Sequence, residues 1–78
     1  MDLGARMAEA LKRVREEAGL TQIEMARRLG ISQPTLHRLE RGDQNITLRV
    51  LGRLCASLRC EPGDLFQPGN LRPPRRRS

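Results

Sequence analysis

The stretch TQIEMARRLGISQPTLHRLERG, residues 21–42, predicts two short helices joined by a tight turn. Thr21 is followed three residues later by Glu24, which is the spacing of a capping box, in which both side chains satisfy backbone N–H groups at the start of a helix. Apolar residues then recur at helical spacing as far as Gly30, a residue that suits the left-handed position after a helix. We therefore expect a first helix of about two turns.

A second helix should follow the turn and extend to about Arg41. Ser32 is a good N-cap, and Pro34 is tolerated in a first turn because its missing N–H would have had no intrahelical partner. Leu36 and Leu39 form the apolar side of this helix. Two helices joined in this way form a helix-turn-helix, whose second helix can enter the major groove of DNA.

The outer side of this second helix carries groups suited to contact bases. Arginine can pair bidentately with guanine, glutamine can pair with adenine, and the ring of Pro34 can touch a thymine methyl. Arg38 is the best candidate for base discrimination, and losing its bidentate contact should cost about 1–3 kcal/mol. His37 has no Cys, Asp or Glu at ligand spacing, which favours contact with a base or phosphate over a metal site. The candidate base-contacting residues are Gln33, Pro34, Thr35, His37 and Arg38.

The longer segment GLTQIEMARRLGISQPTLHRLERG is similar to the Xre-like, lambda-repressor-like helix-turn-helix family. The likeness continues through Thr47 and the LxxL spacing of the next apolar run to the closing DLF at residues 64–66, and it covers about residues 7–66. It implies an all-α, compact five-helix domain that binds double-stranded DNA sequence-specifically as a transcriptional regulator of repressor or controller type. It also implies a homodimer on a two-fold symmetric operator.

The resemblance assigns supporting roles to residues around the second helix. The family commonly pairs an arginine at the position of Arg15 with the glutamate at Glu40. Such a pair is either a buttress that fixes the helix angle on DNA or a surface ion pair worth about 1 kcal/mol or less. Gln22 matches a glutamine that contacts a phosphate and braces the residue at Gln33, with an ordinary polar first-turn residue as the alternative.

The loop after the second helix lies against the phosphate backbone in this family. The resemblance therefore implies phosphate contacts from Arg41, Gln44 and Asn45. Asp43 in the same loop would repel a phosphate, which argues against a close approach of the loop to the backbone.

Two further helices are expected around this unit. Apolar residues at steps of three and four predict an amphipathic helix over residues 2–18. Another should run from Thr47 to about Arg59, which stands where the family usually has a glycine. Either this arginine takes a left-handed conformation or the helix is capped differently. The inward-facing residues expected in this helix are Leu48, Leu51, Leu54, Cys55 and Leu58.

A short final helix is expected to start at residues 61–63, with proline near its first turn. It should end at Leu65 and Phe66, which either close the core or form an apolar patch for a second subunit. Together these elements predict one domain over residues 1–67. The remainder, residues 68–78, is rich in Pro, Gly and Arg and predicts a flexible basic tail that does not pack.

The charge of the chain is concentrated at its C-terminus. The 78 residues carry a formal net charge of +6, but four arginines lie within the last eight residues, and without them the charge is +2. Binding to a polyanion therefore depends on where the arginines lie more than on their number. The tail could follow a DNA duplex, order on a protein partner or serve only as a solubilising end.

Cys55 and Cys60 are poorly placed to form a disulfide, and we expect them to pack in the core rather than serve a redox or metal role. The absence of an apolar signal region or long hydrophobic span indicates a cytoplasmic protein with no membrane segment. We expect no enzymatic activity, cofactor or metal, because no nucleophile with a base, phosphate loop or metal spacing is present. The alternative function is an antitoxin-like protein that neutralises a protein toxin and autoregulates its operon.

Overall fold

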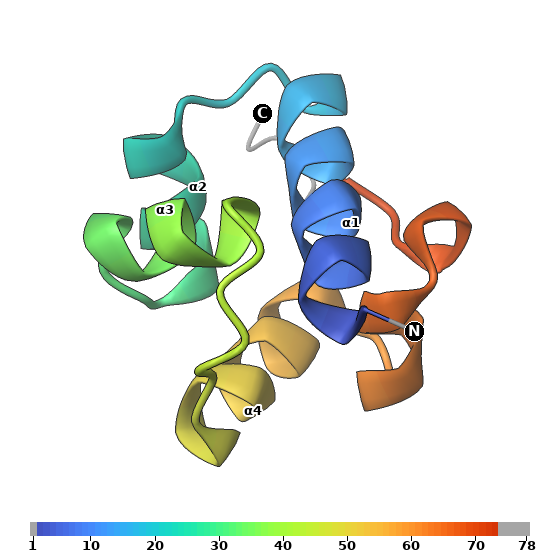
Figure 1. Cartoon of the computed structure of the whole chain (residues 1–78). Coiled ribbons are helices and arrows are strands. Elements are labelled where there is room, and N and C mark those ends of the chain that lie inside the picture. The colour runs from blue at the N-terminus through green and yellow to red at the C-terminus, as the bar shows by residue number, and fades with distance from the viewer. Residues whose placement is uncertain (1, 74–78) are drawn as a thin grey trace.

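The computed structural model describes residues 2–73, and within them all regular secondary structure is helical (Figure 1). Four α-helices are followed by two short 3-10 helices, and no strand occurs in this part of the chain. The all-α prediction is therefore confirmed, whereas the predicted fifth helix is a 3-10 helix of five residues. The elements are α1 (Leu3–Glu17), α2 (Gln22–Leu29), α3 (Gln33–Glu40), α4 (Leu48–Leu58), η1 (Pro62–Phe66) and η2 (Pro68–Asn70).

The α-helices begin at capping residues that the sequence identifies. Thr21 and Glu24 form the predicted capping box at α2, and the Ser32 side chain accepts a hydrogen bond from a backbone N–H at the start of α3. Thr47 caps α4 in the same way. The side chain of Asp2 also caps α1, by accepting from Ala5 N at 3.0 Å.

Two helices end in the left-handed backbone conformation. Gly30 after α2 has φ 71° and ψ 31°, as predicted. Arg59 after α4 has φ 52° and ψ 53°, which confirms the first of the two alternatives for this position. A side chain in this region carries a steric cost that glycine avoids, so the end of α4 is a strained helix terminus.

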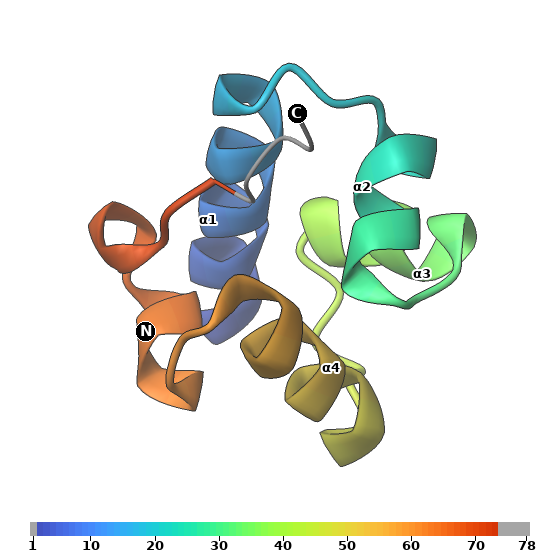
Figure 2. The ribbon, with the colours of Figure 1, turned by 180° about the vertical axis from the view of Figure 1, so that it is seen from behind.

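The α1 helix packs against α3 on one side and against η1 and η2 on the other (Figures 1 and 2). The α2 helix contacts both α3 and α4, and α4 also contacts η1. The helix-turn-helix made of α2 and α3 therefore packs on α1 and α4. The C-terminal segment, residues 62–71, covers the opposite side of α1. The largest fully buried side chains are Leu11, Val14, Met25, Leu29, Leu36, Leu54 and Leu65.

The apolar residues of α4 and η1 differ in part from their predicted positions. Leu65 is fully buried and closes the core, and Phe66 is partly buried against it, so Leu65 cannot form a surface patch for a second subunit. Leu48 was expected to face inward but is 85% exposed. The first turn of α4 projects beyond the neighbouring helices (Figure 1), and Val50 and Leu51 provide the packing instead.

The expectation that residues from 68 onward do not pack is wrong for Pro68–Leu71. Leu71 is 3% exposed and belongs to the hydrophobic core, and η2 lies along α1. The Arg13 guanidinium donates hydrogen bonds to the backbone oxygens of Pro68 at 2.9 Å and Leu71 at 2.6 Å. One buried leucine is enough to anchor Pro68–Leu71, because Arg13 of α1 also provides hydrogen bonds for the backbone carbonyls of this segment. Residues 74–78 of the predicted tail lie outside the described residues.

Cys55 and Cys60 are free thiols, and both are partly buried against the core, which confirms their predicted packing. The backbone N–H of Cys60 donates to the Cys55 carbonyl at 3.1 Å, across the left-handed end of α4. Burial and the neighbouring Cys55 thiol raise the pKa of Cys60 from 9.0 to about 11. No group of three or more His, Cys, Asp or Glu side chains in residues 2–73 is arranged to hold a metal ion.

This raised pKa predicts a loss of stability in alkaline solution. The folded chain retains the Cys60 proton at pH values where the unfolded chain releases it, so the contribution to stability is present below about pH 9 and is lost between about pH 9 and 11. Urea unfolding of the wild type and of Cys60→Ala across this range should show a steeper decline for the wild type. Equal slopes for the two proteins would contradict the prediction.

Candidate nucleic-acid interface

The α3 helix presents one face to the core and the other outward. Its inner residues Leu36 and Leu39 are buried, which fixes the rotation of the helix about its axis. The five candidate base-contacting residues all lie on this helix, and the structure brings them together along it. Three of them are exposed, namely Pro34, His37 and Arg38, and two are partly buried, namely Gln33 and Thr35.

Arg15 and Glu40 form the ion pair that the resemblance predicts. Arg15 Nε donates to Glu40 Oε2 at 2.8 Å, and a second guanidinium nitrogen donates to Glu40 Oε1 at 3.1 Å. The third nitrogen donates to the Leu20 carbonyl at 3.0 Å. The side chains are only 18% and 3% exposed, so the pair is largely buried, and the hydrogen bonds to Glu40 raise the pKa of Arg15.

Gln22 and Gln33 are in contact, again as the resemblance predicts. Gln33 Nε2 donates to Gln22 Oε1 at 2.9 Å, and Gln22 Nε2 donates to Glu40 Oε1 at 3.0 Å. The second of these bonds was not anticipated, and it joins the two expected pairs into one network that runs from Arg15 through Glu40 and Gln22 to Gln33. This polar network ties both ends of α3 to α1 and α2.

The loop after α3 packs closely on the first turn of α1. Gly4 is buried there, and a Cβ at this position would clash with the Gly42 carbonyl oxygen, so only glycine fits. Gln44 Nε2 donates to Asp2 Oδ1 at 3.0 Å. Sequence reasoning did not identify Gly4, because nothing within α1 itself requires a glycine.

The predicted phosphate-contacting residues differ in how they are held. Arg41 is the exposed C-cap of α3, and Gln22, which lies at the start of α2, is part of the partly buried polar network. Gln44 and Asn45 are exposed in the loop, and Gln44 is already bonded to the N-cap of α1. Asp43 accepts the Asn45 backbone N–H at 2.8 Å, so this carboxylate helps to shape the loop.

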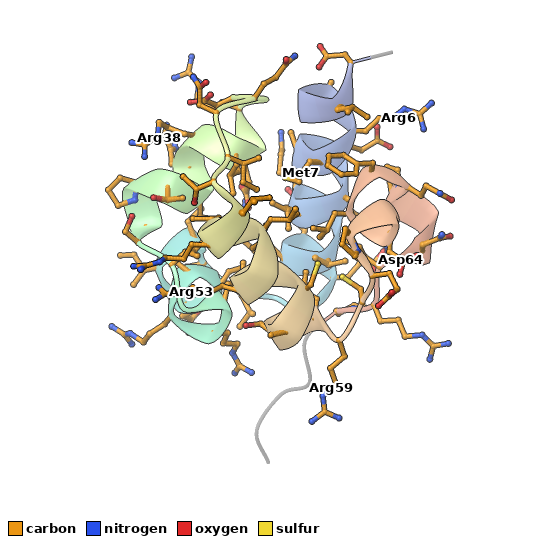
Figure 3. All side chains as sticks on the ribbon, turned by 90° about the horizontal axis from the view of Figure 1, so that it is seen from below. Arg6, Met7, Arg38, Arg53, Arg59 and Asp64 are labelled. Atoms are coloured by element: carbon orange, nitrogen blue, oxygen red, sulfur yellow. The ribbon has the colours of Figure 1, made fainter. Side chains whose placement is uncertain are left out.

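Two arginines from different helices lie on the side of the molecule that carries α3. Figure 3 shows Arg38 from α3 and Arg53 from α4 on the same side. Arg53 donates to the carbonyl of Gly30 at 2.7 Å and so attaches α4 to the turn of the helix-turn-helix. The sequence offers no local signal for this contact, because the two residues are 23 positions apart.

A family model described as helix-turn-helix, HTH_3, matches residues 11–65 of the chain. The chain belongs to the HTH_3 helix-turn-helix family. The match includes α2, α3 and α4, the part of α1 from Leu11 onward, and the loop that follows α3. It confirms the resemblance seen in the sequence and places the exposed face of α3 within the matched region.

Two curated proteins show the same relationship at the level of sequence. An uncharacterized HTH-type transcriptional regulator, y4dJ, of Sinorhizobium fredii is 38% identical over 68 residues, which cover 87% of this chain and 88% of that protein. Antitoxin HipB of Escherichia coli K12 is 38% identical over 52 residues, which cover 67% of this chain and 59% of HipB. This HTH_3 chain therefore covers most of the length of y4dJ but only about three fifths of HipB.

Solved structures of transcription factors share the fold. The hypothetical transcription factor NHTF from Neisseria superimposes with a TM-score of 0.70 at 29% identity, over 83% of this chain and 75% of that one. The clp gene regulator ClgR from C. glutamicum superimposes with a TM-score of 0.65 at 27% identity, over 85% of this chain and 86% of ClgR. An HTH_3 family transcriptional regulator from Vibrio cholerae superimposes with a TM-score of 0.70 at 25% identity, over 87% of this chain and 38% of that one. The family is thus one of transcriptional regulators, a non-enzymatic class.

None of the helices in the described part of the chain combines the length and the apolar character that a membrane span requires.

Proposed function

We propose that this chain is a transcriptional regulator that binds a specific sequence of double-stranded DNA by placing α3 in the major groove. The observation that carries the proposal is the outer face of α3, where Pro34, His37 and Arg38 are exposed while the rest of the helix is held in place. The buried leucines fix its inner face and the network around Glu40 fixes its ends. A helix held in this way can keep donor groups in register with base edges.

The proposed mechanism separates positioning from base recognition. Phosphate contacts position the domain on the duplex, whereas contacts to base edges select the sequence. The free N–H groups at the start of α2 also suit a phosphate. We assign phosphate contacts to Gln22, Arg41, Gln44 and Asn45, and base contacts to Gln33, Pro34, Thr35, His37 and Arg38.

We further propose that the chain acts in the cytoplasm as a homodimer on a two-fold symmetric operator. Two copies related by such an axis place their recognition helices about one turn of DNA apart, which determines the spacing of the half-sites. Analytical ultracentrifugation with an operator duplex should then show two chains per site. One chain per site would rule out the dimer without affecting the proposed role of α3.

Replacing Arg38 with alanine should remove base preference at one position of the half-site. We expect a loss of about 1–3 kcal/mol on the preferred duplex, because a bidentate contact to guanine is lost. The experiment is a selection of bound duplexes from a random pool, followed by titration of the preferred site. Unchanged preference in Arg38→Ala would contradict the assignment of this residue.

Arg41→Ala provides the matched control for that experiment. This exposed arginine is assigned to a phosphate, so its loss should weaken binding to all sequences alike. The slope of log K against log salt concentration should become shallower by about 1, the value for one phosphate contact. Base preference should not change. A wild-type chain that selects no duplex from the pool would overturn the proposed function itself.

The similarity to antitoxin HipB supports a second candidate function. An antitoxin-like chain would bind and neutralise a protein toxin and would also regulate its own operon. Co-expression with a toxin encoded by a neighbouring gene, followed by purification, separates the two possibilities. An antitoxin should keep the toxin bound after Arg38→Ala, and the absence of any such complex would contradict this second function.

A further inference from the structure

The Arg38 guanidinium lies between two acceptors on the surface of the helix-turn-helix. Arg38 Nε is 3.9 Å from Asp43 Oδ2, and a terminal nitrogen, NH2, is 3.5 Å from Thr35 Oγ1. The hydroxyl groups of Thr35 and Ser32 are 2.7 Å apart, which holds the threonine in place. Figure 3 shows Arg38 at the outer edge of the molecule, where the guanidinium is available to a ligand.

The backbone places Asp43 beside Arg38. The Asp43 N–H donates to the Arg38 carbonyl at 3.1 Å, so the carboxylate stands directly after the last turn of α3. Its Oδ1 atom accepts the Asn45 N–H at 2.8 Å, which leaves Oδ2 to face the guanidinium. The two side chains are 29% and 59% exposed, for Asp43 and Arg38 respectively. The carboxylate is therefore fixed by its loop, whereas the arginine can move toward a ligand.

This arrangement favours one of two ways for the guanidinium to donate hydrogen bonds. Arginine can form two parallel bonds either from its side, through Nε and one terminal nitrogen, or from its end, through both terminal nitrogens. In this structure Nε faces the Asp43 carboxylate and NH2 makes a long hydrogen bond to Thr35, so NH1 and the second N–H of NH2, at the end of the guanidinium, remain for a ligand. In the major groove, guanine presents the O6 and N7 acceptors that match such a pair of donors.

We propose that Asp43 is a specificity-determining residue that orients Arg38 end-on toward a guanine of the operator. This inference rests on the proposed function and identifies a residue that acts through Arg38. On DNA the pair is covered and loses water, which strengthens its attraction relative to the exposed state. The same negative charge opposes close contact with phosphates, so Asp43 lowers affinity for all duplexes while it raises the preference for one.

The test compares wild type with Asp43→Asn on two duplexes, one with the guanine preferred at the Arg38 position and one with adenine in its place. Asparagine retains an oxygen that can accept the Asn45 N–H but lacks the charge that attracts Arg38. We expect the ratio of the two Kd values to fall about threefold to tenfold in Asp43→Asn. Binding to the adenine duplex should become tighter, and Asp43→Glu should preserve more of the ratio than Asp43→Asn.

A simple repulsion between Asp43 and phosphates predicts a different result. Both duplexes would then bind Asp43→Asn more tightly by the same factor, and an unchanged ratio would overturn the inference while leaving the proposed function intact. The circular dichroism spectrum and urea midpoint of Asp43→Asn should match those of the wild type, because the pair is exposed and contributes little to folding.

The Arg38→Ala background completes the test. Adding Asp43→Asn to that variant should leave the ratio of the two Kd values unchanged, since the arginine on which Asp43 acts is absent. A further change in this ratio would mean that Asp43 contacts a base by itself and would overturn its positioning role. A wild type without any sequence preference would instead show that the proposed function has failed.

Discussion

Replacing Arg15 with methionine is expected to lower the free energy of unfolding by about 3–5 kcal/mol. The substitution removes the partner of Glu40, whose side chain is only 3% exposed, and leaves its carboxylate in the protein interior with Gln22 as its remaining side-chain donor. Removing one partner of a buried ion pair costs more than the pair contributes, because the other charge stays desolvated. Urea unfolding followed by circular dichroism at neutral pH measures this loss.

Two matched variants show whether the unpaired charge is the cause. Combining Arg15→Met with Glu40→Gln removes the buried charge as well, so most of the lost stability should return. Glu17→Gln breaks the exposed pair with Arg13, whose side chains are 31% and 48% exposed for Arg13 and Glu17, and should change stability by about 0.5 kcal/mol or less. A loss of less than about 1 kcal/mol in Arg15→Met would show that the pair behaves like a surface ion pair.

The same variant links stability to DNA recognition. Glu40 accepts hydrogen bonds from both Arg15 and Gln22, and Gln22 accepts one from Gln33 in the first turn of α3. Loss of Arg15 should therefore loosen the position of Gln33 without touching any exposed residue of α3. A looser Gln33 in this variant would favour the buttress over the surface ion pair, the two alternatives that the sequence left open for Arg15 and Glu40.

The helix-turn-helix was predictable because its signals are local. The capping box at Thr21, the N-cap at Ser32 and the left-handed Gly30 each depend on residues within a few positions in the chain. The Arg15–Glu40 contact spans 25 positions, and it was anticipated only because the family resemblance supplied it. Local periodicity alone contains no information about such a distant pair.

The features that sequence reasoning missed depend on tertiary packing. Leu48 satisfies the apolar spacing of α4, but the first turn of that helix extends beyond the core. The bond between Gln22 and Glu40 and the close approach of Gly4 to Gly42 join segments far apart in the sequence. In each case, the sequence near the residue does not show where the other helix or loop lies in the fold.

The C-terminal segment leads to the second large expected effect. Residues 68–78 are rich in Pro, Gly and Arg and contain too few apolar side chains to form a core by themselves. Leu71 nevertheless packs, because it adds to the hydrophobic core that α1 helps to form. Replacing Leu71 with alanine should lower the free energy of unfolding by about 2–5 kcal/mol, because a buried leucine leaves a cavity that relaxes only in part. Urea unfolding at neutral pH measures the change.

Leu48→Ala provides a control with the same chemical change at a site that is 85% exposed, and it should alter stability by about 0.5 kcal/mol or less. Equal effects of Leu71→Ala and Leu48→Ala would show that the C-terminal segment does not belong to the core. Ending the chain after Gln67 should destabilise it at least as much as Leu71→Ala, because the cut also removes the carbonyls of Pro68 and Leu71 that Arg13 binds. DNA binding by such a shortened chain would therefore be weakened through partial unfolding, so any role of the terminal arginines has to be tested in variants that keep Leu71.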